Sequence, residues 1–320
     1  MKNVLLLGNG INRAYDRQAV SWTDLLDKMT TIENMPKHES LPFPLEMVLR
    51  TNDHVNEVLQ KYNKDLYGVV EDNRLRSILT KVLKMGFDEI LTTNYDYALE
   101  GTARYPRKVT DNWLKKKSMK HTSEVKQAEN TYLLHTYQEA ECEGVVNRIW
   151  HIHGDARRPG SIVIGHYMYV NLVSKWREKI KERVNKYKNW DATQPSECWL
   201  DSFVLGNVYV LGLGMEFCEL DLWWLFNRKK REKEEPHGKI IFYEPKKPED
   251  EAKYALLKAY GVEVRHLGFK LAEREDNEDC DEDLLVEQKK ADDEVWEYNK
   301  KIYTDFYWDA LVDIEREMKK

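Results

Sequence analysis

Cysteine is scarce in this sequence, which carries four among 320 residues, namely Cys142, Cys198, Cys218 and Cys280. No two of them are spaced as a CxxC pair, so a structural zinc ribbon is excluded. A secretory signal is also missing, because the apolar run after Met1-Lys2-Asn3 is only Val4–Leu7. We therefore expect reduced thiols and a cytoplasmic protein.

Long apolar runs and a strong excess of one charge are absent too. Apolar runs such as Val4–Leu7 and Val208–Leu211 fall far short of the roughly 20 residues of a membrane-spanning helix. A net charge of −6 argues against non-specific binding to nucleic acid. With 42% hydrophobic and 11% aromatic residues, the chain has enough core-forming side chains to fold as a soluble globular protein.

Short strand-like runs alternate with helical patterns along the chain. A helix is expected over Glu71–Met85, ended by Gly86, and another between Pro248 and Gly261. The predicted strands are Val4–Leu7, Ile90–Thr92, Ile149–Ile152, Ser161–Ile164, Val208–Leu211, Ile240–Tyr243 and Val262–His266. This alternation predicts an α/β fold of the doubly wound, Rossmann-like type, with a mainly parallel sheet.

Helical insertions are expected in this fold at about residues 20–85, 100–147 and 168–200. Within them, a capping box predicts a helix start near Ser21, and residues 36–44 have loop character. The stretch Tyr169–Asn189 predicts an amphipathic helix with Trp176, Ile180 and Val184 on one side.

Two charged blocks need a simple explanation before a functional one. The basic block 107–126 is better explained as a solvated segment than as a phosphate site. The acidic block 275–283 predicts a linker, followed by an aromatic helix over Asp293–Met318. We therefore divide the chain into a domain over 1–268 and a linker with a final helix over 269–320, and we expect that helix to pack on its own domain rather than bind a partner.

Three motifs whose residues could bind a ligand or take part in catalysis follow predicted strands. The first is Gly8-Asn9-Gly10-Ile11-Asn12, where glycines permit either a tight turn or close approach to a pyrophosphate. The second is Thr92-Thr93-Asn94-Tyr95-Asp96, whose polar side chains either bind a ligand or cap the next helix.

The third motif is Trp150-His151-Ile152-His153-Gly154-Asp155. Strand alternation predicts both histidines on one face. A histidine there is a candidate general base, and the set His151, His153, Asp155 and His166 is a candidate metal site. A buried, hydrogen-bonded histidine beside an exposed one explains the motif equally well.

The order GxG, TxNxD and HG on successive strand ends resembles the sirtuin-like NAD-hydrolase family, the zinc-free bacterial relatives of the sirtuin deacylases. The turn after Val210-Leu211 is similar to the late glycine turn of that family, and the likeness covers roughly residues 1–268. Asn9 and Asn12 replace the usual Ala and Ser, and the four-cysteine zinc module is missing, which argues against deacylation. The GNG and HIHG motifs also resemble the abortive-infection H family.

The resemblance implies which residues act. Catalytic roles fall to Asn94 and His153, with no metal. NAD-binding roles fall to Gly8, Asn9, Gly10, Ile11, Asn12, Thr93, Asp96, Gly212, Gly214, Met215 and Glu244. The implied reaction cleaves the nicotinamide–ribose bond of NAD⁺, giving nicotinamide and ADP-ribose or its cyclic form.

The same resemblance implies a role in bacterial anti-phage defence, with activation through a homo-oligomer or a partner protein. Two other functions remain open at this point. One is a non-catalytic sensor of NAD or ADP-ribose, and the other is a metal-dependent hydrolase that uses the HxHGD cluster.

Overall fold

The computed structural model describes residues 1–15, 72–103, 109–110, 134–155, 161–163, 165–187, 190–191, 196–216, 219–231, 238–247, 250–271 and 282–320, and it describes no side chains at 109–110, 166 or 282–294. The helix start predicted near Ser21, the loop over 36–44 and most of the basic block 107–126 lie outside these residues.

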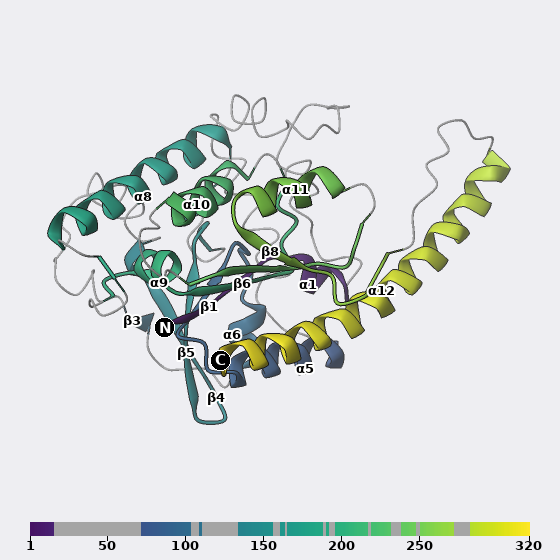
Figure 1. The fold of residues 1–320 in the computed structure, drawn as a ribbon. Coiled ribbons are helices and arrows are strands. Elements are labelled where there is room, and N and C mark those ends of the chain that lie inside the picture. The colour runs from purple at the N-terminus through teal and green to yellow at the C-terminus, as the bar shows by residue number, and fades with distance from the viewer. Residues whose placement is uncertain are drawn as a thin grey trace.

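The centre of the molecule is an eight-stranded sheet with the order β3-β4-β5-β2-β1-β6-β7-β8 (Figure 1). The strands are β1 (Asn3–Leu7), β2 (Glu89–Thr92), β3 (Val109–Thr110), β4 (Tyr137–Cys142), β5 (Val145–His151), β6 (Asn207–Leu211), β7 (Ile240–Tyr243) and β8 (Val262–Arg265).

The strands from β5 to β8 in this order run parallel, whereas β3 and β4 are antiparallel additions at one edge. Counted along the chain, the parallel strands have the spatial order 3-2-1-4-5-6 that defines the doubly wound dinucleotide-binding fold. The predicted fold class is confirmed.

Helices cover both faces of the sheet (Figure 1). One face carries α8 (His166–Lys186), α9 (Trp199–Leu205), α10 (Leu220–Arg231) and α11 (Glu251–Ala259). The other carries α1 (Gly10–Arg13), α5 (Asn73–Lys84), α6 (Ala98–Thr102) and α12 (Glu282–Met318). Among the described residues, no helix combines the length and apolar character needed to cross a bilayer.

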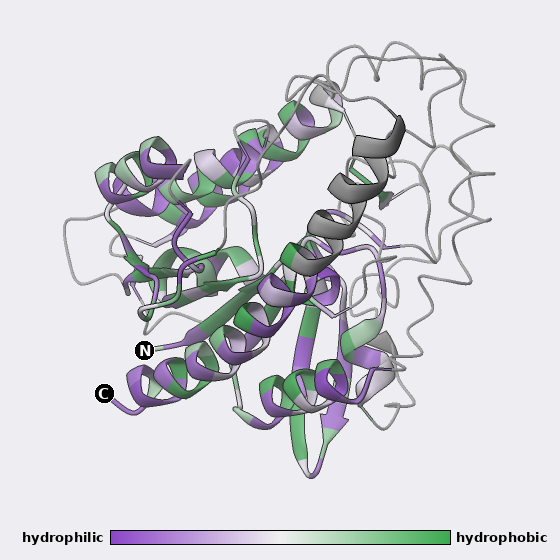
Figure 2. Cartoon of the chain, turned by 90° about the vertical axis from the view of Figure 1, so that its right-hand side faces the viewer, coloured by the Kyte–Doolittle hydropathy of each residue, from purple (hydrophilic) through white to green (hydrophobic). Residues whose placement is uncertain are grey.

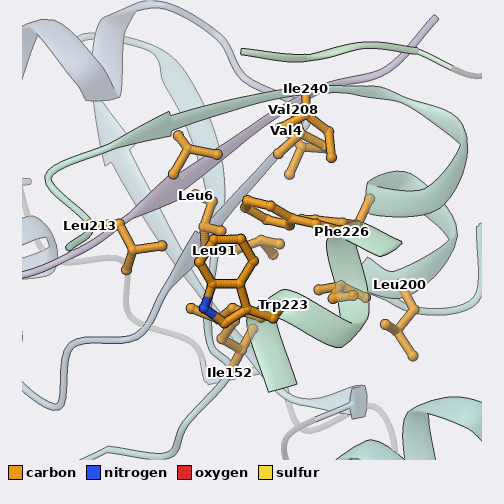
Figure 3. Packing of buried hydrophobic residues seen from close by; sticks show 14 of the residues in the cluster. Val4, Leu6, Leu91, Ile152, Leu200, Val208, Leu213, Trp223, Phe226 and Ile240 are labelled. Atoms are coloured by element: carbon orange, nitrogen blue, oxygen red, sulfur yellow. The ribbon is translucent and has the colours of Figure 1, made fainter. Parts of the chain in front are cut away.

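The apolar run of β1 is explained by this double cover. Val4 and Leu6 pack into the core on the α10 side, and Leu5 and Leu7 pack into the core on the α5 side. Figure 3 shows Trp223 and Phe226 of α10 against side chains of β1, β2, β6 and β7. A strand buried on both faces needs apolar residues at every position, so it does not alternate.

The start, the end and the buried face of helix α5 all follow from residues within or next to it in the sequence. Asp72 caps its first turn by accepting hydrogen bonds from the backbone N–H groups of Arg74 and Leu75. Gly86, with φ of 72°, follows its end. Its buried side chains recur at the three- and four-residue spacing of one helix face, and they are Leu75, Ile78, Leu79, Val82 and Leu83.

Helix α12 begins at Glu282, inside the acidic block, rather than at Asp293. Its C-terminal half is amphipathic (Figure 2), and Phe306, Tyr307 and Leu311 are buried in the same core as α5. Arg265 Nη1 donates to the Asp313 carboxylate, which also accepts a hydrogen bond from the Tyr243 hydroxyl at 2.9 Å. The helix thus packs on its own domain, as predicted, while its first turns extend away from the sheet (Figure 1).

Some local predictions were wrong. Residues 161–163 are not a strand, because Val163 N donates to His153 O at 2.8 Å and the segment packs beneath Tyr95, whose hydroxyl donates to Val163 O. The predicted helical insertion 100–147 contains β3, β4 and the start of β5, joined through a tight turn at Glu143 and Gly144, both with positive φ.

A further correction concerns helix α8. Val184 is exposed, and Arg183 takes the buried position instead. Arg183 Nε donates to Asp201 Oδ1 at 2.9 Å, which satisfies the buried charge. Trp176 and Ile180 are buried as expected.

Candidate functional site

The candidate residues follow neighbouring strands at the carboxyl ends of the parallel part of the sheet. β5, β2, β1 and β6 are adjacent and parallel, and the segments after them carry His153, Asn94, Asn12 and Asp221. The chain leaves β1 toward the α5 face and β6 toward the α10 face. Such a switch point is where open α/β sheets bind ligands.

Two glycine turns, which follow β1 and β6, pack directly against each other at these strand ends. Gly8 N donates to Leu211 O at 2.9 Å, and Gly10 N donates to Gly212 O at 2.7 Å. A Cβ on Gly10 would lie 2.8 Å from Gly212 O, and Gly212 has φ of 69°. These glycines therefore hold two backbones together, which supports the tight-turn interpretation. Helix α1 has only four residues, with Ile11 buried within it.

A hydrogen bond joins the first and second motifs. Asn12 Nδ2 donates to Asn9 Oδ1 and to Asp96 Oδ2, both at 3.1 Å. Asp96 Oδ1 accepts from the N–H of Ala98, the first residue of α6, at 2.9 Å. The N-cap residue is Tyr97, whose side chain makes no capping hydrogen bond, so Asp96 contacts the helix start from the position before the cap. Burial raises the pKa of the Asp96 carboxyl. Asp96 thus links the two motifs and has both oxygens engaged.

Asn94 lies two residues beyond β2 and is 8% exposed. Its backbone N–H is held by Thr92 Oγ1 at 3.0 Å, and its backbone carbonyl lies 2.8 Å from His151 Nδ1. No described residue donates a hydrogen bond to the buried side-chain oxygen, Oδ1. The neighbouring Thr93 is tied to β1 through its N–H and Leu7 O.

His151 is fully committed to structural contacts. Its Nε2 lies 2.8 Å from Glu100 Oε1, and its other ring nitrogen contacts Asn94 O. Burial lowers the pKa of the imidazole, but the charge and hydrogen bond of Glu100, together with Asp155, raise it to about 9. His151 is therefore a buried cation at neutral pH.

His153 faces the opposite side of the sheet from His151, so the prediction that both histidines share one face was wrong. β5 ends at His151, and a turn through Gly154, with φ of 89°, breaks the alternation. His153 is buried edge-on against Tyr169 of α8. Its Nε2 lies 2.6 Å from Asp221 Oδ2 in the first turn of α10.

Asp221 and Glu219 are site residues that sequence reasoning missed. Asp221 is buried, and no described group donates to its Oδ1. Burial and the nearby Asp221 raise the pKa of Glu219 to about 7, against the opposing effect of His153. Glu219 Oε2 also accepts from Glu216 N at 2.8 Å. The available signal was a pair of acids at a helix start just after the late glycine turn.

The remaining predicted residues lie around the end of β6 and β7. Gly214 O accepts from Lys253 Nζ at 3.1 Å, and Met215 is buried with φ of 53°. Both oxygens of Glu244 are occupied: Oε1 by Lys247 at 2.7 Å, and Oε2 by Lys253 at 3.0 Å and Tyr254 at 3.1 Å. A ribose would have to compete with these partners for Glu244.

The described members of the candidate metal set do not form a group that could hold an ion. Over the described part of the chain, no three His, Cys, Asp or Glu residues are grouped so as to hold an ion. His151 pairs with Glu100, His153 with Asp221, and Asp155 with the Tyr97 hydroxyl. The side chain of His166 is outside the described residues.

Comparison with known proteins identifies the domain. A family model described as a SIR2-like domain matches residues 88–265, more than half of the chain and everything from β2 to β8. No curated protein matches the chain significantly. SIR2-like domains use NAD as a substrate. On the strength of this match and the sheet order, the chain belongs to the SIR2-like domain family.

Proposed function

We propose that this protein is an NAD⁺ glycohydrolase that releases nicotinamide and ADP-ribose, or its cyclic form. The observation that carries the proposal is a set of buried acceptor atoms without donors in the described structure, Asn12 Oδ1, Asn94 Oδ1 and Asp221 Oδ1. They belong to the segments after β1, β2 and β6, at the switch point of the sheet. Each unsatisfied acceptor costs about 1–3 kcal/mol, and the hydroxyl groups of a ribose or an attacking water would supply the missing donors.

The reaction suits side chains of this kind. The nicotinamide leaves as a neutral base from a cationic pyridinium, so the enzyme needs no general acid. The transition state resembles an oxocarbenium ion, as in glycoside cleavage, and catalysis consists mainly of orienting the sugar and water and stabilising spread positive charge. In the proposed mechanism, the Asn94 carboxamide positions the ribose and the water, and His153 accepts a proton from the water or from a ribose hydroxyl.

The glycine turns and Asp96 take a supporting role in this proposal. The Asn12–Asp96 hydrogen bond connects the turn after β1 to the segment that carries Asn94. Ligand binding at one turn would therefore be communicated to Asn94 through a single side-chain contact. Thr93, Gly212, Gly214, Met215 and Glu244 complete the proposed NAD site, with Glu244 contacting the adenosine ribose after rearrangement of Lys247.

The direct test incubates the purified 320-residue chain with NAD⁺ and follows nicotinamide and ADP-ribose by chromatography. We expect nicotinamide to appear in stoichiometric amounts with ADP-ribose or its cyclic form. If no nicotinamide appears at any protein concentration or temperature tested, and calorimetry shows that ADP-ribose binds, the protein is a non-catalytic sensor and not a hydrolase. Sensitivity of turnover to chelators would instead favour the metal-dependent hydrolase.

We also propose, by family resemblance, that the activity serves bacterial anti-phage defence and is triggered by self-association or a partner protein. Exposed Tyr298 and Trp308 on α12 offer a contact surface for such a trigger. Measuring cellular NAD⁺ in phage-challenged cells that express the active chain or an Asn94→Ala variant tests this role. Equal NAD⁺ levels in the two cultures would overturn it.

A further inference from the structure

The contact between His153 and Asp221 defines which ring nitrogen of His153 carries hydrogen. His153 Nε2 and Asp221 Oδ2 are 2.6 Å apart, and both side chains are buried, with 3% and 0% exposure. A carboxylate only accepts hydrogen bonds, so the hydrogen lies on Nε2. In the neutral imidazole, Nδ1 then carries the lone pair.

The fold holds Asp221 firmly in this position. It is the second residue of α10, whose next turns bury Leu222, Leu225 and Phe226 against the sheet. The preceding segment is tied to the helix, because Trp223 Nε1 donates to Glu216 O at 3.0 Å. The backbone that carries Asp221 is therefore held by the core on this face, and its side chain is fully buried.

We propose that Asp221 is the positioning residue of His153: it fixes the Nε2–H tautomer and the ring orientation, so that Nδ1 is the atom that accepts the proton. This inference rests on the proposed glycohydrolase function. The proton comes from the attacking water or from a ribose hydroxyl, and the C–N bond to nicotinamide breaks as the new C–O bond forms. When Nδ1 takes that proton, the ring becomes an imidazolium, and the Asp221 carboxylate stabilises its charge.

A second acid supports this arrangement. Glu219 precedes α10 and interacts electrostatically with both His153 and Asp221. Because its pKa lies at about 7, Glu219 is largely neutral below that pH. Glu219 therefore adds little negative charge near His153 in mildly acidic solution, and the carboxyl group in direct contact with the imidazole is that of Asp221. Tyr169 packs against the imidazole in an edge-to-face contact, with the two ring centroids 5.5 Å apart.

The test compares Asp221→Asn with Asp201→Asn. Asp201 is a matched control, since it is also a buried aspartate in the first turn of a helix and also accepts from a side-chain N–H group, that of Arg183 Nε. We expect Asp221→Asn to lower kcat about 100-fold or more while KM for NAD⁺ changes less than about threefold. Asp201→Asn should lose stability and keep kcat within about twofold of wild type. Asp221→Glu, which keeps the carboxylate, should recover part of the lost kcat.

The second measurement is independent of turnover. Nitrogen-15 NMR of histidine-labelled protein, with the His153 signals assigned by their loss in His153→Gln, distinguishes the two tautomers. We expect Nε2–H in the wild type and a mixture of tautomers in Asp221→Asn. A wild-type ring protonated on Nδ1 overturns the proposal, as does an Asp221→Asn enzyme with undiminished kcat. If the wild type releases no nicotinamide, the glycohydrolase function fails, and the spectrum still decides whether Asp221 orients His153.

Discussion

Two histidines two residues apart have different surroundings in this molecule. His151 lies on the α6 side of the sheet, with one ring nitrogen on Glu100 and the other on the Asn94 carbonyl. His153 lies on the α10 side, with Nε2 on Asp221. The first is a buried cation with no nitrogen left to accept a proton. For the second, the described hydrogen bond involves Nε2, and Nδ1 is the proposed proton acceptor. The partners of each ring, and not the residue type, therefore distinguish the structural histidine from the proposed catalytic one.

The backbone and the side chain of Asn94 have different surroundings. Its backbone carbonyl contacts His151, whereas its side-chain Oδ1 has no donor within the described residues. One histidine thus fixes the loop that presents the carboxamide, and the other is proposed to act on the substrate that the carboxamide holds. Buried polar groups that are satisfied make a site rigid, and those left open are candidates for ligand contacts.

The largest expected effect separates the two histidines by kinetics. His153→Gln should lower kcat about 1,000-fold, because the proposed proton acceptor is removed. The matched His151→Gln variant should keep kcat within about tenfold, because the amide can still contact Glu100 or the Asn94 carbonyl. Steady-state nicotinamide release measures both, and circular dichroism checks that each variant folds. Equal losses in the two variants would contradict the distinction between them.

Asn94→Ala is expected to have the next largest effect. Removing the carboxamide leaves the backbone contact to His151 in place and deletes only the side chain proposed to orient the sugar and water. We expect kcat to fall about 100-fold with little change in melting temperature. The measurement pairs NAD⁺ turnover with thermal unfolding. Full activity in this variant would remove Asn94 from the site.

The pH dependence of stability tests the His151 environment. Its folded pKa of about 9 lies above the ordinary value of 6.5. A raised folded pKa stabilises the fold fully below pH 6.5, and this stabilisation is lost as pH rises through 9. The shift corresponds to about 3 kcal/mol. Urea unfolding at several pH values should show this loss in the wild type, and a difference curve against His151→Gln should isolate it. A difference curve that is flat between pH 6.5 and 9 would show that the ring is neutral in the folded protein.

The sequence predicted the fold well where short-range patterns coincide with long-range packing. The apolar runs of β1, β6 and β7 and the buried face of α5 are each encoded by adjacent residues. Residues 161–163 have the same apolar character but pack against Tyr95 instead of joining the sheet. Local composition reports that a segment is buried, and it does not report which partner buries it.

The candidate site was predictable where its residues directly follow buried strands, and not where they pair across the fold. Strand ends gave the positions of Asn94 and His153, because polar residues after buried strands meet at one edge. Asp221 lies 68 residues after His153, and nothing local to either residue indicates that they pair. Likewise, the family resemblance gives Glu244 an NAD-binding role, yet Lys247 and Lys253 contact its carboxylate oxygens. Only the folded chain brings these side chains together. Contacts across the fold decide which side chains remain available.

The smallest predicted effect concerns Glu219, on the His153 side of the comparison. Below its pKa of about 7 the carboxyl is largely neutral, so Glu219→Gln should leave kcat at pH 6 within about twofold of wild type. Above that pH the wild-type carboxylate adds negative charge beside His153 and Asp221 and stabilises the imidazolium formed in the reaction. The variant lacks this charge, and we expect its kcat at pH 8 to fall about threefold below wild type. The ratio of the two pH–rate profiles measures this. A ratio that stays constant from pH 6 to pH 8 would show that the electrostatics of His153 depend on Asp221 without a contribution from Glu219.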